Sequence, residues 1–193
     1  MTLVFATNNA HKLQEITAMV GNSFIIKSLR DINCFDEIPE TGDTLEENAL
    51  QKARYIYEKY AYNCFADDTG LEIEALGGAP GVYTARFAGE ACTAEDNVQK
   101  TLSLMQDKEN RYAMFRTVIA CIIGGKEYVF EGAVQGTIAT KTMGSKGFGY
   151  DPIFIPEGYA ESFAQMPMNE KNTISHRARA CEKFLKFLKE IRE

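Results

Sequence analysis

The sequence lacks the cysteine and histidine patterns of metal-binding or disulfide-rich proteins. Five cysteines are spread singly along the chain, with no CxxC pair: Cys34, Cys64, Cys92, Cys121 and Cys181. No histidine lies near them at metal-ligand spacing. Structural zinc sites and disulfide frameworks need such pairs or spacings, so neither is expected.

Excess positive charge and long apolar runs are also absent. The net charge of -6 argues against a sequence-independent nucleic-acid binder, because such a protein needs a basic surface to displace counterions. The apolar stretch at residues 3–6 is too short for a secretory signal, and no later run approaches a membrane-spanning length. We therefore expect a cytoplasmic protein that has neither a nucleic-acid nor a membrane partner. A small phosphorylated ligand stays compatible, since local cationic groups can bind it.

The standard phosphate-binding motifs are missing too. The chain has no GxxxxGK[ST] loop and no GxGxxG that follows a strand in the required context, so a P-loop or Rossmann assignment has no support. No repeat, low-complexity tract or linker divides the 193 residues, of which 45% are hydrophobic. The simplest interpretation is one globular domain over residues 1–193, in two lobes at most.

Apolar periodicity predicts alternating strands and helices. Strands are predicted over residues 2–6, 24–29, 64–66, 71–74, 112–123 and 127–139. Helices are predicted after the turn at 7–9, after the capping box at 44–47, over 94–105 and from about 176. Gly124 and Gly125 join the two longest strands as a hairpin, which must be antiparallel. The pattern as a whole predicts an α/β fold with a mixed sheet.

Two polar clusters precede or begin helices. Thr7, Asn9, Lys12 and Glu15 lie at a strand-to-helix junction, where backbone N–H groups and a lysine suit a phosphate. The alternative there is an ordinary capped helix with a solvated lysine. Lys52 falls at the edge of the buried stripe of its helix, so it either extends along the core surface or points into a cleft.

A third cluster, Asp67 to Gly70, is predicted to follow directly after a short strand. Two adjacent carboxylates repel each other unless a positive group lies nearby, and Mg²⁺ is a common partner for such oxygens. An Asp-rich turn without a ligand is the alternative.

Two further clusters lie in the C-terminal part of the chain. In Gly147–Pro152, glycines flank an aromatic ring that could stack on a base, and Asp151 could accept from the edge of a heterocycle. The alternative is a tight aromatic loop packed on the core. Residues 170–177 place three donors at the predicted start of the last helix, which suits an anion, whereas the alternative is a solvated basic cap.

Taken in order, these segments resemble the non-canonical purine nucleoside triphosphate pyrophosphatases, the family that includes the inosine triphosphatases. The opening Thr7–Glu15 fits the family pattern TxNxxKxxE. The other matching segments follow in family order: Glu40–Gly42, Glu47–Ala49, Lys52–Ala53, Ala66–Leu71, Leu76–Arg86, Gly147–Pro152 and Ser175–Arg177. Each is weak alone, but the ordered set is specific and spans nearly the whole chain.

The resemblance implies an elongated mixed β-sheet flanked by helices, with two lobes, a central nucleotide-binding cleft and a homodimeric state. It also implies Mg²⁺-dependent hydrolysis of ITP, dITP and XTP to the monophosphate and pyrophosphate. The implied metal ligands are Glu40 and Asp68, and Asp68 is also the implied catalytic proton acceptor. The implied substrate-binding residues near the triphosphate are Thr7, Asn8, Asn9, Ala10, His11, Lys12 and Lys52. The remaining implied substrate-binding residues are Thr69, Phe148, Gly149, Tyr150, Asp151, Lys171, His176 and Arg177.

The division of roles among the carboxylates stays open at the level of sequence. A carboxylate bound to Mg²⁺ is a weaker base, so Asp67 or Glu40 could share the work of Asp68. A phosphatase with Asp67 as covalent nucleophile is one alternative function. A nucleotide-binding protein without turnover is the other.

Overall fold

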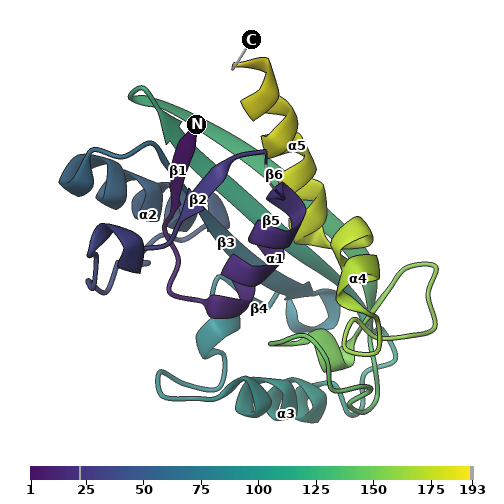
Figure 1. Cartoon of the computed structure of the whole chain (residues 1–193). Coiled ribbons are helices and arrows are strands. Elements are labelled where there is room, and N and C mark those ends of the chain that lie inside the picture. Colours follow the sequence, from purple (N-terminus) through teal and green to yellow (C-terminus); the bar gives the residue numbers. More distant parts are fainter. Residues whose placement is uncertain (22, 192–193) are drawn as a thin grey trace. The chain divides into compact units, whose positions relative to one another are not determined.

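The structure is a computed structural model that describes residues 1–21 and 23–191. Its helices are α1 (Ala10–Val20), α2 (Leu45–Tyr60), α3 (Ala94–Leu104), α4 (Met168–Ile174) and α5 (His176–Glu190). Its strands are β1 (Thr2–Phe5), β2 (Ile25–Lys27), β3 (Cys64–Ile73), β4 (Pro80–Gly81), β5 (Tyr112–Ile123), β6 (Lys126–Ile138) and β7 (Phe154–Pro156). Figure 1 shows these elements along the chain. None of the described helices is long and apolar enough to cross a membrane.

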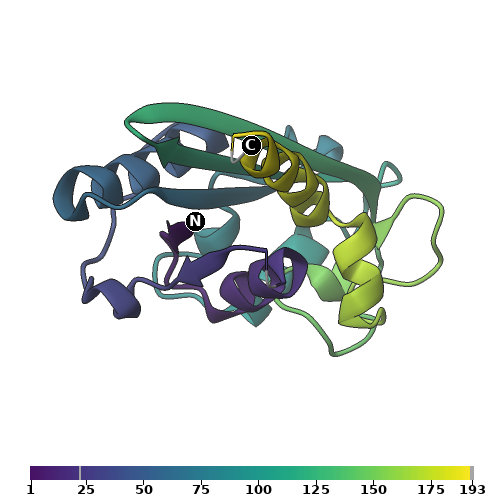
Figure 2. The same cartoon turned by 45° about the horizontal axis from the view of Figure 1, so that its top comes forward.

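The strands form one sheet in the order β2-β1-β3-β5-β6-β7, and β4 pairs with β3. β1 is parallel to β2 and to β3, whereas β3 with β4 and β6 with β7 are antiparallel. Gly124 and Gly125 connect β5 to β6 with φ of 56° and 79°, which glycine adopts without a steric penalty. Figure 2 shows the two long strands of this hairpin. The predicted mixed α/β class is confirmed.

The chain divides into two compact units, and the first comprises residues 1–68, 117–132 and 177–193. Its core joins β1, α1, β3 and α5, and Phe5 stacks on Phe65 with ring centroids 4.5 Å apart. α2 begins with the predicted capping box, in which Thr44 accepts from the Glu47 amide and Glu47 accepts from the Thr44 amide. Ile191 is 43% exposed because it lies beyond the last turn of α5.

The second unit comprises residues 69–116 and 133–176. Its core is built from aromatic and aliphatic side chains of β3, α3, β5, β6 and β7. Phe115, Phe154 and Phe163 contact one another at its centre, with ring centroids 4.7 to 6.3 Å apart. Phe115 and Phe163 also lie beside the ring of His176, the first residue of α5.

One predicted break between strands is wrong, and one helix was not predicted. Separate strands were predicted over residues 64–66 and 71–74, but β3 runs without a break from Cys64 to Ile73. The strand can continue because cationic side chains from other elements neutralise the buried carboxylates, so no turn is needed to expose them to water. A separate helix, α4, also precedes α5 and carries Lys171.

Candidate functional site

Lys52 projects from α2 into a group of oxygen atoms. Its ammonium donates to a carboxylate oxygen of Glu40, lies 3.8 Å from Asp68 Oδ1 and donates to the carbonyl oxygen of Asp67 at 2.8 Å. The side chain is only 9% exposed. Of the two options that the sequence left open, the structure supports a lysine directed at charged groups.

Asp67 occupies the centre of the charged cluster in unit 1. Lys12 Nζ lies 3.1 Å from its Oδ1, and Arg177 Nε donates to its Oδ2 at 3.1 Å. Arg177 Nη1 also donates to Glu15 Oε2 at 2.5 Å. Arg177 is therefore held by two carboxylates, and Lys12 is an ion-pair partner with a side chain 14% exposed, not a solvated lysine.

Asp68 and Glu40 are the two carboxylates nearest to Lys52 that are open to solvent. Asp68 has 11% of its side chain exposed and Glu40 has 33%, whereas Asp67 has none. Asn48 Nδ2, on the buried stripe of α2, donates to Asp68 Oδ2 at 3.1 Å. A ligand from solvent can thus reach Asp68 and Glu40 but not Asp67.

The electrostatic surroundings shift the pKa values of the two aspartates in opposite directions. Burial raises the pKa of Asp67, but the charges of Lys12, Arg177 and Lys52 outweigh it and hold that pKa below its ordinary value. For Asp68, burial dominates and the nearby Glu40 adds to it, so its pKa is raised despite Lys52. Asp68 is therefore the better proton acceptor of the two.

Burial and neighbouring charges also shift the pKa values of Lys12 and Lys52, in opposite directions. Burial lowers the pKa of Lys12 more than the charge of Asp67 raises it. Burial also acts to lower the pKa of Lys52, but the charges of Asp68 and Glu40 outweigh it and the pKa is raised. Lys52 is thus firmly protonated, as a group that binds phosphate must be.

The start of α1 is capped from within the chain. Asn9 Oδ1 accepts from the backbone N–H groups of His11 and Lys12 at 3.0 and 3.2 Å, and Thr7 Oγ1 accepts from the Asn9 amide at 3.1 Å. The backbone N–H groups that the sequence offered to a phosphate here are thus bonded to polar side chains, as in the alternative of a capped helix. Asn8, Asn9, Ala10 and His11 are exposed, and Thr7 is half-buried.

The loop before β7 brings together another predicted set in unit 2. Lys171 Nζ donates to Asp151 Oδ2 at 2.6 Å, and the same oxygen accepts from the Phe148 amide at 2.8 Å. The Lys171 ammonium lies 4.9 Å from the centroid of the Phe148 ring. Gly147 has φ of 73°, and a Cβ there would meet Asp151 Oδ2 at 2.1 Å, so the loop requires glycine.

The other predicted residues of unit 2 have varied surroundings. Tyr150 is buried and its hydroxyl donates to the Thr84 carbonyl at 2.8 Å, so its main contact is structural. The His176 ring is buried and stacks on Phe115, with centroids 4.5 Å apart. Gly149 has φ of 62° and is half-buried, and Thr69 is a half-buried residue of β3.

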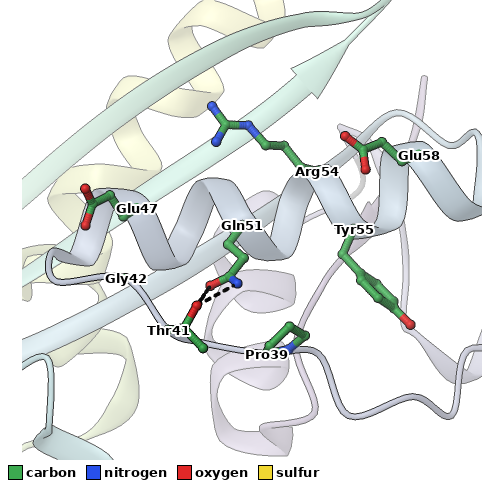
Figure 3. A pocket seen from close by; sticks show the side chains of 8 residues that line it. All are labelled: Pro39, Thr41, Gly42, Glu47, Gln51, Arg54, Tyr55 and Glu58. Carbon is green, nitrogen blue, oxygen red and sulfur yellow. Dashed lines mark hydrogen bonds between the residues drawn. The ribbon is translucent and has the colours of Figure 1, made fainter.

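A hollow on unit 1 lies apart from these residues. It is formed by the loop before α2 and one side of that helix, as Figure 3 shows: Pro39, Thr41, Gly42, Glu47, Gln51, Arg54, Tyr55 and Glu58. None of the predicted site residues lines it. Thr41 and Gln51 hydrogen-bond each other there, and these bonds connect the loop of Glu40 to α2.

Two buried polar residues had no role of their own assigned from the sequence. Asn48 contacts Asp68, and Glu15 contacts Arg177. A usable signal existed for Asn48, because it lies one helical turn before Lys52 on the stripe that also contains Leu45 and Ala49. Glu15 next to buried Ile16 offers a weaker signal, since its partner is 162 residues away.

The carboxylates of Glu40 and Asp68 could supply part of the ligand shell of a hard divalent cation. Among the residues that the structure describes, no three side chains of His, Cys, Asp or Glu gather around one point. Glu40 and Asp68 both approach Lys52 with partly exposed carboxylates. Mg²⁺ commonly takes one or two carboxylates and completes its shell with water and substrate phosphates, so this pair fits such an ion.

Comparison with known proteins places the chain in a family. The Ham1 family profile matches residues 3–187, so the chain belongs to the Ham1 family. A dITP/XTP pyrophosphatase from Flavobacterium johnsoniae is 51% identical over 188 residues, which cover 97% of this chain and 98% of that protein. One from Porphyromonas gingivalis is 52% identical over 187 residues, or 96% of each chain.

A solved structure agrees with these sequence matches. A HAM1 protein from Coxiella burnetii superposes with a TM-score of 0.90 at 35% identity, and covers 98% of this chain and 99% of that one. The resemblance that the ordered motifs predict is therefore confirmed over nearly the full length.

Proposed function

We propose that this protein hydrolyses dITP, ITP and XTP to the nucleoside monophosphate and pyrophosphate. The observation that carries the proposal is the cluster in unit 1, where Lys12, Lys52 and Arg177 alternate with carboxylates. Hydrolysis of a phosphoanhydride depends mainly on positioning and charge neutralisation, and this cluster supplies both. The names of the Flavobacterium and Porphyromonas relatives, which are dITP/XTP pyrophosphatases, support two of these substrates.

The triphosphate is proposed to bind Lys12 and Lys52. Both ammonium groups are largely buried, where a charge acts on an anion with less screening than in water. The exposed residues Asn8, Asn9, Ala10 and His11, with Thr7, would complete the phosphate contacts. Since Asn9 caps the helix, a phosphate at this turn would replace its contacts with the amides of His11 and Lys12.

Glu40 and Asp68 are proposed to hold Mg²⁺. The ion would neutralise phosphate charge and polarise the bond to be broken. The chain's own part is to hold the two carboxylates near each other, which Lys52 does by contacting both. Asp68 is proposed also to accept the proton from water, because its pKa is raised whereas that of the adjacent Asp67 is lowered.

The base is proposed to bind in unit 2. The Phe148 ring offers a stacking face, and Asp151 and Lys171 offer an acceptor and a donor. Lys171 is suited to a 6-oxo group, which hypoxanthine and xanthine have and adenine lacks. Further proposed contacts of the substrate involve Thr69, Gly149, Tyr150, His176 and Arg177.

Asp67 is poorly placed as a covalent nucleophile. Lys12 contacts one of its carboxylate oxygens and Arg177 the other, and the side chain is fully buried. A nucleophile needs a free, reachable lone pair. This argues against the alternative of a phosphatase with an aspartyl-phosphate intermediate.

The test is an activity screen over purine nucleoside triphosphates with separate pyrophosphate and orthophosphate readouts, with Mg²⁺ or excess chelator. We expect pyrophosphate release from dITP, ITP and XTP, much slower turnover of ATP, and no activity in chelator. Orthophosphate as the first product would favour the phosphatase. Binding without any product would favour a nucleotide-binding protein.

A further inference from the structure

Asn48 links the two carboxylates of the proposed metal site. Its Nδ2 donates to Asp68 Oδ2 at 3.1 Å, and its Oδ1 accepts from the Gly42 amide at 2.8 Å. Gly42 lies two residues after Glu40, so one side chain contacts both the strand of Asp68 and the loop of Glu40. Asn48 is 1% exposed, and both contacts lie within unit 1.

The amide is suited to this position because it carries a donor and an acceptor at opposite sides of one short group. Burying an amide costs free energy unless both ends are hydrogen-bonded, and here both are. The loop also approaches closely, since a Cβ at Gly42 would meet Glu47 Cβ at 2.5 Å and Asn48 Oδ1 at 3.0 Å. Glycine at position 42 and asparagine at position 48 therefore depend on each other.

We infer that Asn48 is a positioning residue that fixes the separation of Glu40 and Asp68 for a divalent cation. The inference rests on the proposed role of these two carboxylates. Groups that orient metal ligands from behind typically change metal affinity or activity by about 10- to 100-fold when they are removed. Loss of the Asn48 contacts would free the loop of Glu40 and the carboxylate of Asp68 to move independently.

Gln51 provides a matched control on the same helix. Its Oε1 accepts from the Thr41 amide at 2.9 Å and its Nε2 donates to Thr41 Oγ1 at 3.1 Å. It thus anchors the same loop from the outer side, but its side-chain hydrogen bonds within the described part of the chain go to Thr41. A role in loop anchoring alone predicts the same outcome for both residues.

The experiment compares Asn48→Leu and Asn48→Ala with Gln51→Met by electron paramagnetic resonance of Mn²⁺ bound to the nucleotide-free protein. Thermal unfolding confirms that each variant is folded at the assay temperature. If Asn48→Leu does not fold, Asn48→Ala is used in its place. We expect Mn²⁺ to bind at least about tenfold more weakly in the folded Asn48 variant than in Gln51→Met. We also expect a matching rise in the Mg²⁺ concentration that half-saturates dITP hydrolysis.

A difference in Mn²⁺ affinity of less than tenfold would overturn the inference, as would a lack of Mn²⁺ binding by the unmodified protein. Failure of the unmodified protein to hydrolyse dITP would instead overturn the proposed function. In that case the Mn²⁺ measurement still decides whether Asn48 positions the two carboxylates.

Discussion

Asp67 and Asp68 are neighbours in β3, yet their side chains are stabilised in opposite ways. Asp67 is fully buried between Lys12 and Arg177, and its charged form is favoured. Asp68 is slightly exposed, and burial with Glu40 nearby disfavours its charged form. Because strand residues alternate in direction, adjacent carboxylates can have separate surroundings.

This difference predicts opposite effects of Asp67→Asn and Asp68→Asn on stability. Asp67 binds its proton less tightly in the folded chain, so it stabilises the fold above its unfolded pKa of about 3.9 and loses this effect as the pH falls further. Asp67→Asn should therefore lower the free energy of unfolding at pH 7 by about 3–5 kcal/mol, because it leaves buried cations without that partner.

Ionisation of Asp68 has the opposite effect on the stability of the fold. Its pKa is raised on folding, so ionisation opposes the folded state as the pH rises from about 3.9 through the raised value. We expect Asp68→Asn to raise the unfolding midpoint at pH 7 in chelator, to show no gain below about pH 4, and to abolish hydrolysis. Urea unfolding at pH 7 and pH 3.5 measures both variants, and a stability loss for Asp68→Asn at pH 7 would contradict the assignment.

At the scale of elements, the loop before β7 depends on one glycine. Gly147 adopts a positive φ and passes so close to Asp151 that no side chain fits between them. The contact keeps the Asp151 carboxylate against Lys171 and the Phe148 amide. The conformation of the loop and the charges beside the Phe148 ring are therefore coupled.

We expect Gly147→Ala to raise KM for dITP by at least about tenfold and to reduce the preference for dITP over dATP, because the Cβ displaces Asp151. Gly158→Ala is the control, since Gly158 has φ of 84° but an added Cβ meets nothing within 4 Å. It should show only the left-handed strain of about 1–2 kcal/mol in stability. Steady-state kinetics on both nucleotides checks this, and equal effects of the two variants would refute the proposed coupling.

At the scale of the whole molecule, the start of α5 is tied to the first helix and to the third strand. Arg177 contacts Glu15 in α1 and Asp67 in β3, which are 162 and 110 residues away in sequence. Its pKa is raised, because the charges of Asp67 and Glu15 outweigh the effect of burial. These contacts are non-local, so they form only when unit 1 is assembled.

We expect Arg177→Met to lower the free energy of unfolding by about 3–5 kcal/mol, since it leaves two buried carboxylates without their shared cation. Lys183 lies on the same helix as Arg177 and donates to the carbonyl oxygen of Glu131 at an exposed position. Lys183→Met should therefore change the free energy of unfolding by no more than about 0.5 kcal/mol. Urea unfolding at pH 7 measures both.

The Arg177→Met variant also distinguishes two possible roles of Arg177. If Arg177 acts through Asp67 and Glu15, kcat/KM for dITP and dATP should fall by similar factors. Loss of preference for dITP without a comparable loss of rate would instead show that Arg177 contacts the base.

The homodimeric state and the cytoplasmic location stay predictions, and light scattering of the purified protein tests the homodimeric state.

The sequence by itself determined the family, the mixed α/β class, the capping box of α2 and most of the charged residues that the structure brings together. These features are local or depend on short ordered motifs, so periodicity and residue identity suffice to detect them. Lys12, Lys52, Asp68 and Asp151 could all be chosen in this way.

Only the tertiary structure decided which charges meet. The continuous strand at Asp67 and Asp68, the burial of Glu15 and the position of Arg177 all depend on partners far away in sequence. Sequence patterns report that a position is buried or polar, but a buried charge is stable only beside a particular opposite charge. That pairing is set by how distant segments pack, because the free energy of an ion pair depends on the final distance and burial of both groups.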